Sequence, residues 1–114
     1  MTPTDELRTA AATLRSNAEA AHRASPGPWT ITEERVIRCA DGMIVADRSS
    51  TEHPAEHADL PFIAAMDPTV GLALADWLEE AARQEAYTRA EFGHRGGAGV
   101  HALAIARAIN GSQP

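Results

Sequence analysis

The residues of this sequence that come nearest to a catalytic motif are His53, Glu56 and His57. They match the H-x-x-E-H pattern, in which two histidines bind zinc and the glutamate acts as general base. That chemistry needs both histidines on one helical face and a third protein ligand. Because Pro54 restricts the segment to a helix start, His53 falls at or before the cap. We therefore expect His53 and His57 to be solvated and to hold no stoichiometric zinc, with a metal-dependent hydrolase as an alternative function.

A glycine-rich segment with one arginine, residues 93–99, precedes the last predicted helix. Free backbone N–H groups before a helix bind anions, and the candidate ligand-binding residues are Arg95, Gly96, Gly97 and Gly99. A phosphate loop follows a strand and ends in Gly-Lys-Ser or Gly-Lys-Thr, whereas this segment follows a predicted helix and has no lysine. The pattern favours a connector between helices. A module that binds a nucleotide or another small ligand here is a further alternative.

The remaining reactive side chains indicate no enzyme. Cys39 is the only cysteine, so no intrachain disulfide or cysteine metal cluster is possible, and we expect a buried, inert thiol. Serine, histidine and aspartate occur, but no G-x-S-x-G motif places a nucleophile. We predict no catalytic residue and no cofactor.

Alanine and charge dominate the composition. Of the 114 residues 24 are alanine, so large core side chains are few. All ten basic residues are arginine, and the net charge of −6 is concentrated in residues 41–91, which hold eleven carboxylates and three arginines. An acidic middle repels phosphate backbones and argues against general nucleic-acid binding. No apolar run is long enough to span a membrane and no signal peptide is evident, so we expect a cytoplasmic protein.

Residues 1–24 carry the signals of a helix. Thr2 is a suitable N-cap, Pro3 suits the first helical position, and the carboxylate of Asp5 favours the first turn. Apolar residues recur at spacings of four and three and form one stripe: Leu7, Ala11, Leu14, Ala18 and Ala21. The segment Ser25-Pro26-Gly27-Pro28 ends the helix.

Residues 29–47 predict a small antiparallel meander. Asp41-Gly42 between two apolar runs is typical of a two-residue type I′ hairpin turn, in which both residues need a positive φ. That turn pairs Ala40 with Met43, Cys39 with Ile44, Arg38 with Val45 and Ile37 with Ala46. The predicted core face consists of Ile37, Cys39, Ile44 and Ala46, and the other face includes Val36, Met43 and Val45.

Residues 56–92 predict helices, residues 93–99 a connector, and residues 100–110 a last helix. Pro61 is compatible with the first turn of a helix over 56–66, and Asp67-Pro68 supplies the cap and first residue of a long helix to about Phe92. Its expected buried face carries Val70, Leu74, Trp77, Leu78 and Ala81, and its solvated face Glu79, Glu80 and Glu85. We expect one α+β domain over residues 1–114, with two or three C-terminal helices on one face of a two- or three-stranded sheet.

Short motifs are spread along residues 27–78. They are Gly27-Pro28-Trp29, Ala40-Asp41-Gly42, Val45-Ala46, Ala58-Asp59, Phe62-Ile63-Ala64-Ala65, Pro68 and Leu72-Ala73-Leu74. In this order they resemble the ead-type products of lambdoid phage early regions and their actinobacterial counterparts. The resemblance implies an accessory protein of a phage or mobile element, without an agreed catalytic activity, and adds no site residue.

These features predict a non-enzymatic accessory protein that binds another protein, such as a host factor. We also expect a homodimer, because few large side chains are available to cover several apolar stripes. The predicted uncovered surfaces are one side of the last helix and the strip of Val36, Met43 and Val45 on the sheet.

Overall fold

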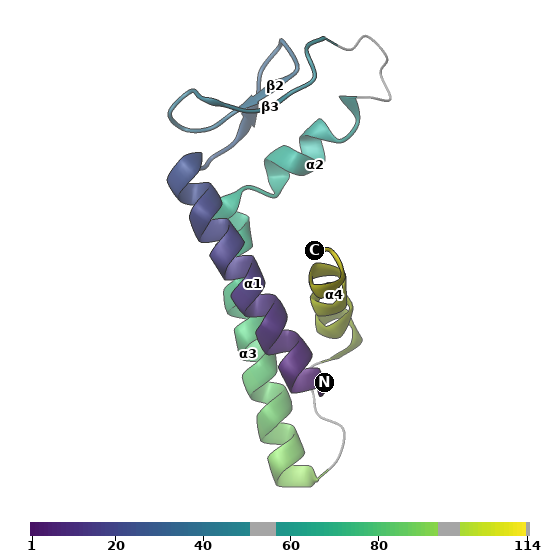
Figure 1. The fold of residues 1–114 in the computed structure, drawn as a ribbon. Helices are drawn as coiled ribbons and strands as arrows, with labels where there is room; N and C mark the ends of the chain where they lie inside the picture. The colour runs from purple at the N-terminus through teal and green to yellow at the C-terminus, as the bar shows by residue number, and fades with distance from the viewer. Residues whose placement is uncertain (51–56, 94–98, 114) are drawn as a thin grey trace. The chain divides into compact units, whose positions relative to one another are not determined.

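The computed structural model describes residues 1–50, 57–93 and 99–113 and has the predicted α+β architecture (Figure 1). Helix α1 spans Pro3–Ala24, and the strands are β1 at Thr30–Ile31, β2 at Val36–Arg38 and β3 at Ile44–Asp47. The later helices are α2 at Leu60–Ala65, α3 at Pro68–Phe92 and α4 at Gly99–Gly111. The chain divides into two compact units: unit 1 comprises Met1–Asn17 and Leu72–Pro114, and unit 2 comprises Ala18–Gly71.

Helix α1 starts with the predicted cap. The backbone N–H of Asp5 donates to Oγ1 of Thr2 at 3.1 Å, and the backbone N–H of Thr2 donates to Oδ2 of Asp5 at 3.2 Å. These reciprocal hydrogen bonds satisfy N–H groups that the first helical turn leaves without a partner. They also stabilise the charged carboxylate, so the pKa of Asp5 lies below its usual value, chiefly because of the Thr2 hydroxyl.

The core of unit 1 is built largely from alanine. Its buried cluster joins α1, α3 and α4 through Leu7, Ala10, Ala11, Leu78, Ala81, Ala82, Ala102 and Ala106. Leu14, Leu103, Ile105 and Ile109 pack against this cluster and are partly buried. Small side chains allow helices to approach closely, so a core with few large residues can still exclude water.

Polar side chains connect the helices of unit 1 around that core. The guanidinium of Arg15 on α1 contacts Asp76 at 2.7 Å and Glu79 at 2.8 Å on α3. Glu6 on α1 pairs with Arg107 on α4 at 3.2 Å, and its backbone carbonyl accepts a hydrogen bond from the amide of Asn110. These contacts join neighbouring helices at the edge of the core.

Unit 2 contains a three-stranded antiparallel sheet in the order β1-β2-β3. The loop between β2 and β3 differs from the prediction. The N–H of Gly42 donates to the carbonyl of Cys39 at 2.9 Å, and the N–H of Cys39 donates to the carbonyl of Met43 at 2.9 Å. Among the loop residues Gly42 alone has a positive φ, 85°. The connection is therefore a three-residue loop with a bulge at the left-handed glycine, and the predicted two-residue type I′ turn is wrong.

The longer loop changes the pairing of the hairpin. Arg38 faces Ile44, whereas Ile37 faces Ala46 as predicted, because a bulge in β3 at Val45 restores the register. The pairing of Cys39 with Ile44 and that of Arg38 with Val45 are wrong. Ile44 is 51% exposed and leaves the predicted core face, while Val36 from the predicted outer face is buried.

The loop between β1 and β2 repeats the same hydrogen-bond pattern without a glycine. The N–H of Arg35 donates to the carbonyl of Thr32 at 3.1 Å, and the N–H of Thr32 donates to the carbonyl of Val36 at 2.8 Å. Arg35 occupies the left-handed position with φ 65°. That conformation is uncommon for a residue with a Cβ, so this turn carries backbone strain that the glycine turn avoids.

Helix α2 lies against β1 and β2. Pro61 is in its first turn, as predicted, but the helix begins at Leu60 instead of Glu56. The buried apolar residues of the sheet and α2 are Val36, Ile37, Cys39 and Leu60. The burial of Cys39 agrees with the prediction of an enclosed thiol.

Asp67, in unit 2, is the N-cap of α3, as predicted. Its Oδ1 accepts hydrogen bonds from the backbone N–H groups of Thr69 and Val70 and from the Thr69 hydroxyl, at 2.9, 3.2 and 2.5 Å. The backbone N–H of Trp29 also donates to this carboxylate. Gly27 lies so close that a Cβ there would be 3.2 Å from Oδ2 of Asp67. The segment Gly27-Pro28-Trp29 therefore lies beside the buried carboxylate of Asp67.

Candidate protein-binding surfaces

Most of the sequence-predicted site residues lie outside the described residues: Arg95, Gly96, Gly97 and His53. Gly99 is described, is exposed and begins α4 with φ 77°. His57 is half-buried and precedes α2. Within residues 1–50, 57–93 and 99–113, no group of three or more His, Cys, Asp or Glu could hold a metal ion. Because most of both candidate sites lies outside the described residues, the hydrolase and nucleotide-binding alternatives stay predictions.

The buried face of α3 in unit 1 agrees with the prediction at Leu78 and Ala81 and differs from it at other positions. Ala75, Leu78, Ala82 and Glu85 are buried, whereas Trp77 is 45% exposed. The placement of Trp77 in the core and of Glu85 on the solvated side is wrong. Ala75 and Ala82, which lie three and four residues from Leu78, let α3 approach its neighbours closely, which a tryptophan on the same face would prevent. Glu85 is 2% exposed and pairs with Arg89 at 3.1 Å.

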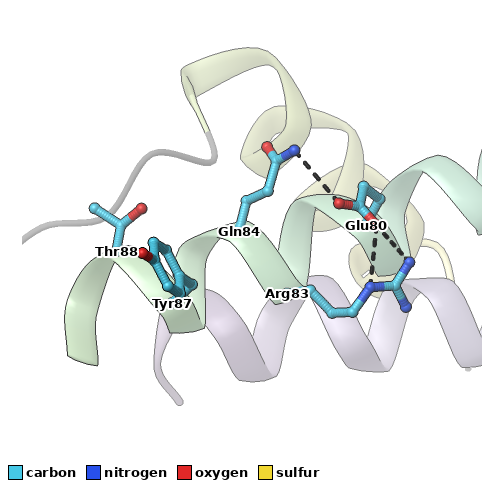
Figure 2. Close-up of a pocket in the computed structure, with 5 residues that line it drawn as sticks. All are labelled: Glu80, Arg83, Gln84, Tyr87 and Thr88. Carbon is cyan, nitrogen blue, oxygen red and sulfur yellow. Dashed lines mark hydrogen bonds and ion pairs between the residues drawn. The ribbon is translucent and has the colours of Figure 1, made fainter. Parts of the chain in front are cut away.

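The opposite face of α3 carries a stripe that we call the α3 stripe: Trp77, Glu80, Gln84 and Tyr87. These residues follow helical spacings of three and four, so they lie along one side of the helix. Together with Arg83 and Thr88, the last three line a surface hollow of about 390 Å³ (Figure 2). The described residues of its wall all come from α3, which makes it an open depression instead of an enclosing ligand pocket.

The centre of the α3 stripe is charged and ordered. Glu80 accepts hydrogen bonds from the guanidinium of Arg83 at 2.5 and 3.0 Å and from the amide of Gln84 at 3.5 Å (Figure 2). The Arg83 hydrogen bond holds the pKa of Glu80 below its usual value. The side chains of Glu80 and Arg83 are still 52% and 64% exposed, so both can accept further partners.

A second exposed apolar surface lies at the tip of the β2–β3 hairpin in unit 2. We call Met43 and Ile44 the hairpin surface; they are 65% and 51% exposed. The guanidinium of Arg38, which faces Ile44 across the sheet, donates to the carbonyl of Gly42 at 2.8 Å and holds the loop in place. In the described part of the sheet β3 is an edge strand, so backbone groups beside this surface face outward.

Comparison with models of protein families, with curated proteins and with solved structures finds no match to this chain. The resemblance to phage early-region products therefore stays a prediction. The proposed function is therefore argued from the exposure, contacts and charge of the described residues.

The distribution of aromatic residues is the feature that sequence reasoning missed. The chain has five aromatic residues, and Phe62, Trp77, Tyr87 and Phe92 are between 45% and 70% exposed. Trp29 is half-buried, and its indole N–H donates to the carbonyl of Ser25 at 2.7 Å. Alanine thus fills the core of unit 1 while large apolar side chains lie at the surface. The alanine spacing along α3, at positions 75 and 82 around Leu78, was the available signal for this arrangement.

Proposed function

We propose that the protein is a non-enzymatic accessory protein that binds another protein through the hairpin surface. The observation that carries this proposal is the exposure of Met43 and Ile44, at 65% and 51%, at the tip of the β2–β3 hairpin. Exposed methionine side chains are typical of adaptable protein-binding surfaces, and covering Met43 and Ile44 would remove a large apolar area from water.

The charge of unit 2 supports a basic partner. Residues 18–71 contain nine carboxylates and four arginines, a net charge of −5, out of −6 for the chain. Complementary charge accelerates association and favours partners of opposite sign. The exposed edge of β3 adds backbone groups that can pair with an extended segment of the partner.

The biological setting is part of the same proposal. A phage or mobile-element origin, with a host factor as partner, rests on the motifs of residues 27–78. A cytoplasmic location is proposed from the sequence alone. Among the described residues, none of the helices combines the length and the hydrophobicity of a membrane span.

Affinity capture from the native host tests the proposal. The wild-type protein is compared with Met43→Asp and Ile44→Asp, and with the control Val100→Asp, which changes an exposed apolar residue of unit 1. We expect one set of basic proteins to be captured by the wild type and the control, to be lost in both hairpin variants, and to elute as salt rises. Equal capture by all four proteins, or capture by none, would refute binding through the hairpin surface.

A further inference from the structure

We propose that the α3 stripe is a homodimer interface, in which two copies of α3 pack antiparallel about a two-fold axis. This surface belongs to unit 1 and is separate from the hairpin surface through which partner binding is proposed. The α3 stripe is symmetric in sequence. Trp77 and Tyr87 are equidistant in sequence from residue 82, and so are Glu80 and Gln84.

A two-fold axis exploits that symmetry. In an antiparallel pair centred on residue 82, Trp77 lies level with Tyr87 of the second copy, and Glu80 with Gln84 of the second copy. Ten residues of helix span about 15 Å, so one aromatic pair closes each end of a contact of that length. The same patch then serves both subunits, as a two-fold dimer requires.

The charges at the centre are self-complementary. Glu80 lies within one residue of the level of Arg83 of the second copy, about 1.5 Å along the axis. Each carboxylate can then contact two guanidinium groups and each guanidinium two carboxylates. Within one chain these two side chains already pair, yet each remains more than half exposed. Such an exposed pair contributes little by itself, whereas a network enclosed by aromatic residues is desolvated and orients the two helices.

On the other two surfaces predicted to mediate a dimer most residues are covered, although Val100 on α4 and Met43 on the sheet remain exposed. On α4, Ala102 and Ala106 are buried, and Leu103, Ile105 and Ile109 pack against the core of unit 1. On the sheet, Val36 is buried and Val45 half-buried. The α3 stripe, in contrast, leaves Trp77 45% and Tyr87 65% exposed on one helix face.

Sedimentation of the full chain at concentrations from about 1 to about 100 μM tests the interface. We expect the wild type to sediment at twice the chain mass of 12.1 kDa. Trp77→Ala should weaken association by about tenfold or more, because tryptophan is enriched among binding hot spots and removes a large apolar area from water when covered. Val100→Ala, a change of an exposed apolar residue on α4, should leave the dimer intact.

Charge exchange provides the sharper test. Glu80→Arg and Arg83→Glu should each give monomers, because each places like charges opposite one another. The double variant Glu80→Arg/Arg83→Glu should dimerise again, and an equal mixture of the two single variants should form a heterodimer. Glu19→Arg, an exposed acidic position outside the stripe, is the matched control. Circular dichroism verifies that every variant is folded.

Two results would overturn the interface. One is a wild-type protein that remains at 12.1 kDa throughout the concentration range. The other is a dimer that the single charge variants do not dissociate. Met43→Asp separates this proposal from partner binding, since that variant should lose the partner while retaining the dimer.

Discussion

Unit 1 and unit 2 are each stabilised internally by a different kind of interaction. In unit 1, three helices bury a cluster of alanine and leucine, and surface ion pairs join neighbouring helices. In unit 2, a small apolar core is combined with side chains that hydrogen-bond to the backbone, notably Asp67, Trp29 and Arg38.

The difference indicates where each unit is sensitive to change. The stability of unit 1 depends on shape and volume, so a cavity should be costly while loss of an exposed ion pair should matter little. The stability of unit 2 depends on turns and caps, so a single carboxylate or a single φ angle should matter there. Four substitutions test this contrast, in order of decreasing expected effect.

Leu78→Ala should have the largest effect and should act on unit 1. Leu78 is fully buried among alanines that cannot expand to fill the space, so we expect a loss of about 3 kcal/mol in unfolding free energy. Each unit contains one tryptophan, Trp77 in unit 1 and Trp29 in unit 2. Fluorescence melts in Trp29→Phe and Trp77→Phe backgrounds therefore follow the units separately.

The two probes also test the prediction of a single domain. Equal downward shifts of both transitions would mean that the units unfold together. A shift seen by Trp77 alone would mean that they unfold independently. An unchanged transition in both backgrounds would contradict the role of Leu78 in the core.

Asp67→Ala should have the next largest effect and should act on unit 2. We expect a loss of about 2 kcal/mol in unfolding free energy, because the substitution removes the cap of α3 and the hydrogen-bond acceptor of the Trp29 N–H. Hydrogen bonds, first of all from the Thr69 hydroxyl, hold the pKa of Asp67 below its usual value. In the unfolded chain the side chain of Asp67 has the ordinary aspartate pKa of about 3.9. The stabilisation by the charged form is thus complete at neutral pH and is lost as pH falls through the lower folded pKa.

Denaturant titrations at several pH values check this pH dependence. The stability difference between the wild type and Asp67→Asn should narrow as the pH falls from about 6 to about 3. A constant difference across that range would mean that the charge of Asp67 does not contribute to its role as a cap.

Gly42→Val should destabilise unit 2 by about 1–2 kcal/mol. Gly42 has φ 85° and open space around the position of a Cβ, so the cost comes from the backbone conformation and not from a clash. Gly111→Ala, at a glycine for which no positive φ is found, is the matched control. A melting temperature equal to that of the wild type would contradict the left-handed assignment.

Arg35→Gly should have the smallest effect and the opposite sign. It places a glycine at the left-handed position of the β1–β2 loop and relieves strain there, while increasing the entropy of the unfolded chain. We expect the unfolding free energy, measured by urea titration, to rise by up to about 1 kcal/mol. A loss of stability would show that the Arg35 side chain contributes more than its backbone costs.

Much of the secondary structure was predictable because its signals are local. The Thr2–Asp5 cap, the stop after Ala24, the Asp67-Pro68 start and the glycine at the β2–β3 loop act within a few residues. The β1–β2 loop lacked such a signal, since Arg35 has no intrinsic preference for a positive φ. The candidate surfaces were not predictable in the same way, because exposure depends on which faces the other helices cover.

The sequence by itself determined where α1 begins and ends, where α3 begins and that Gly42 must accept a left-handed conformation, because capping and φ preferences are properties of neighbouring residues. Only the tertiary structure decided the buried face of α3, the three-residue loop and the exposure of Ile44. Alanine lies all around α3, so its apolar pattern is compatible with more than one face. Close approach between helices selected the face of Ala75, Leu78 and Ala82 and left Trp77 at the surface.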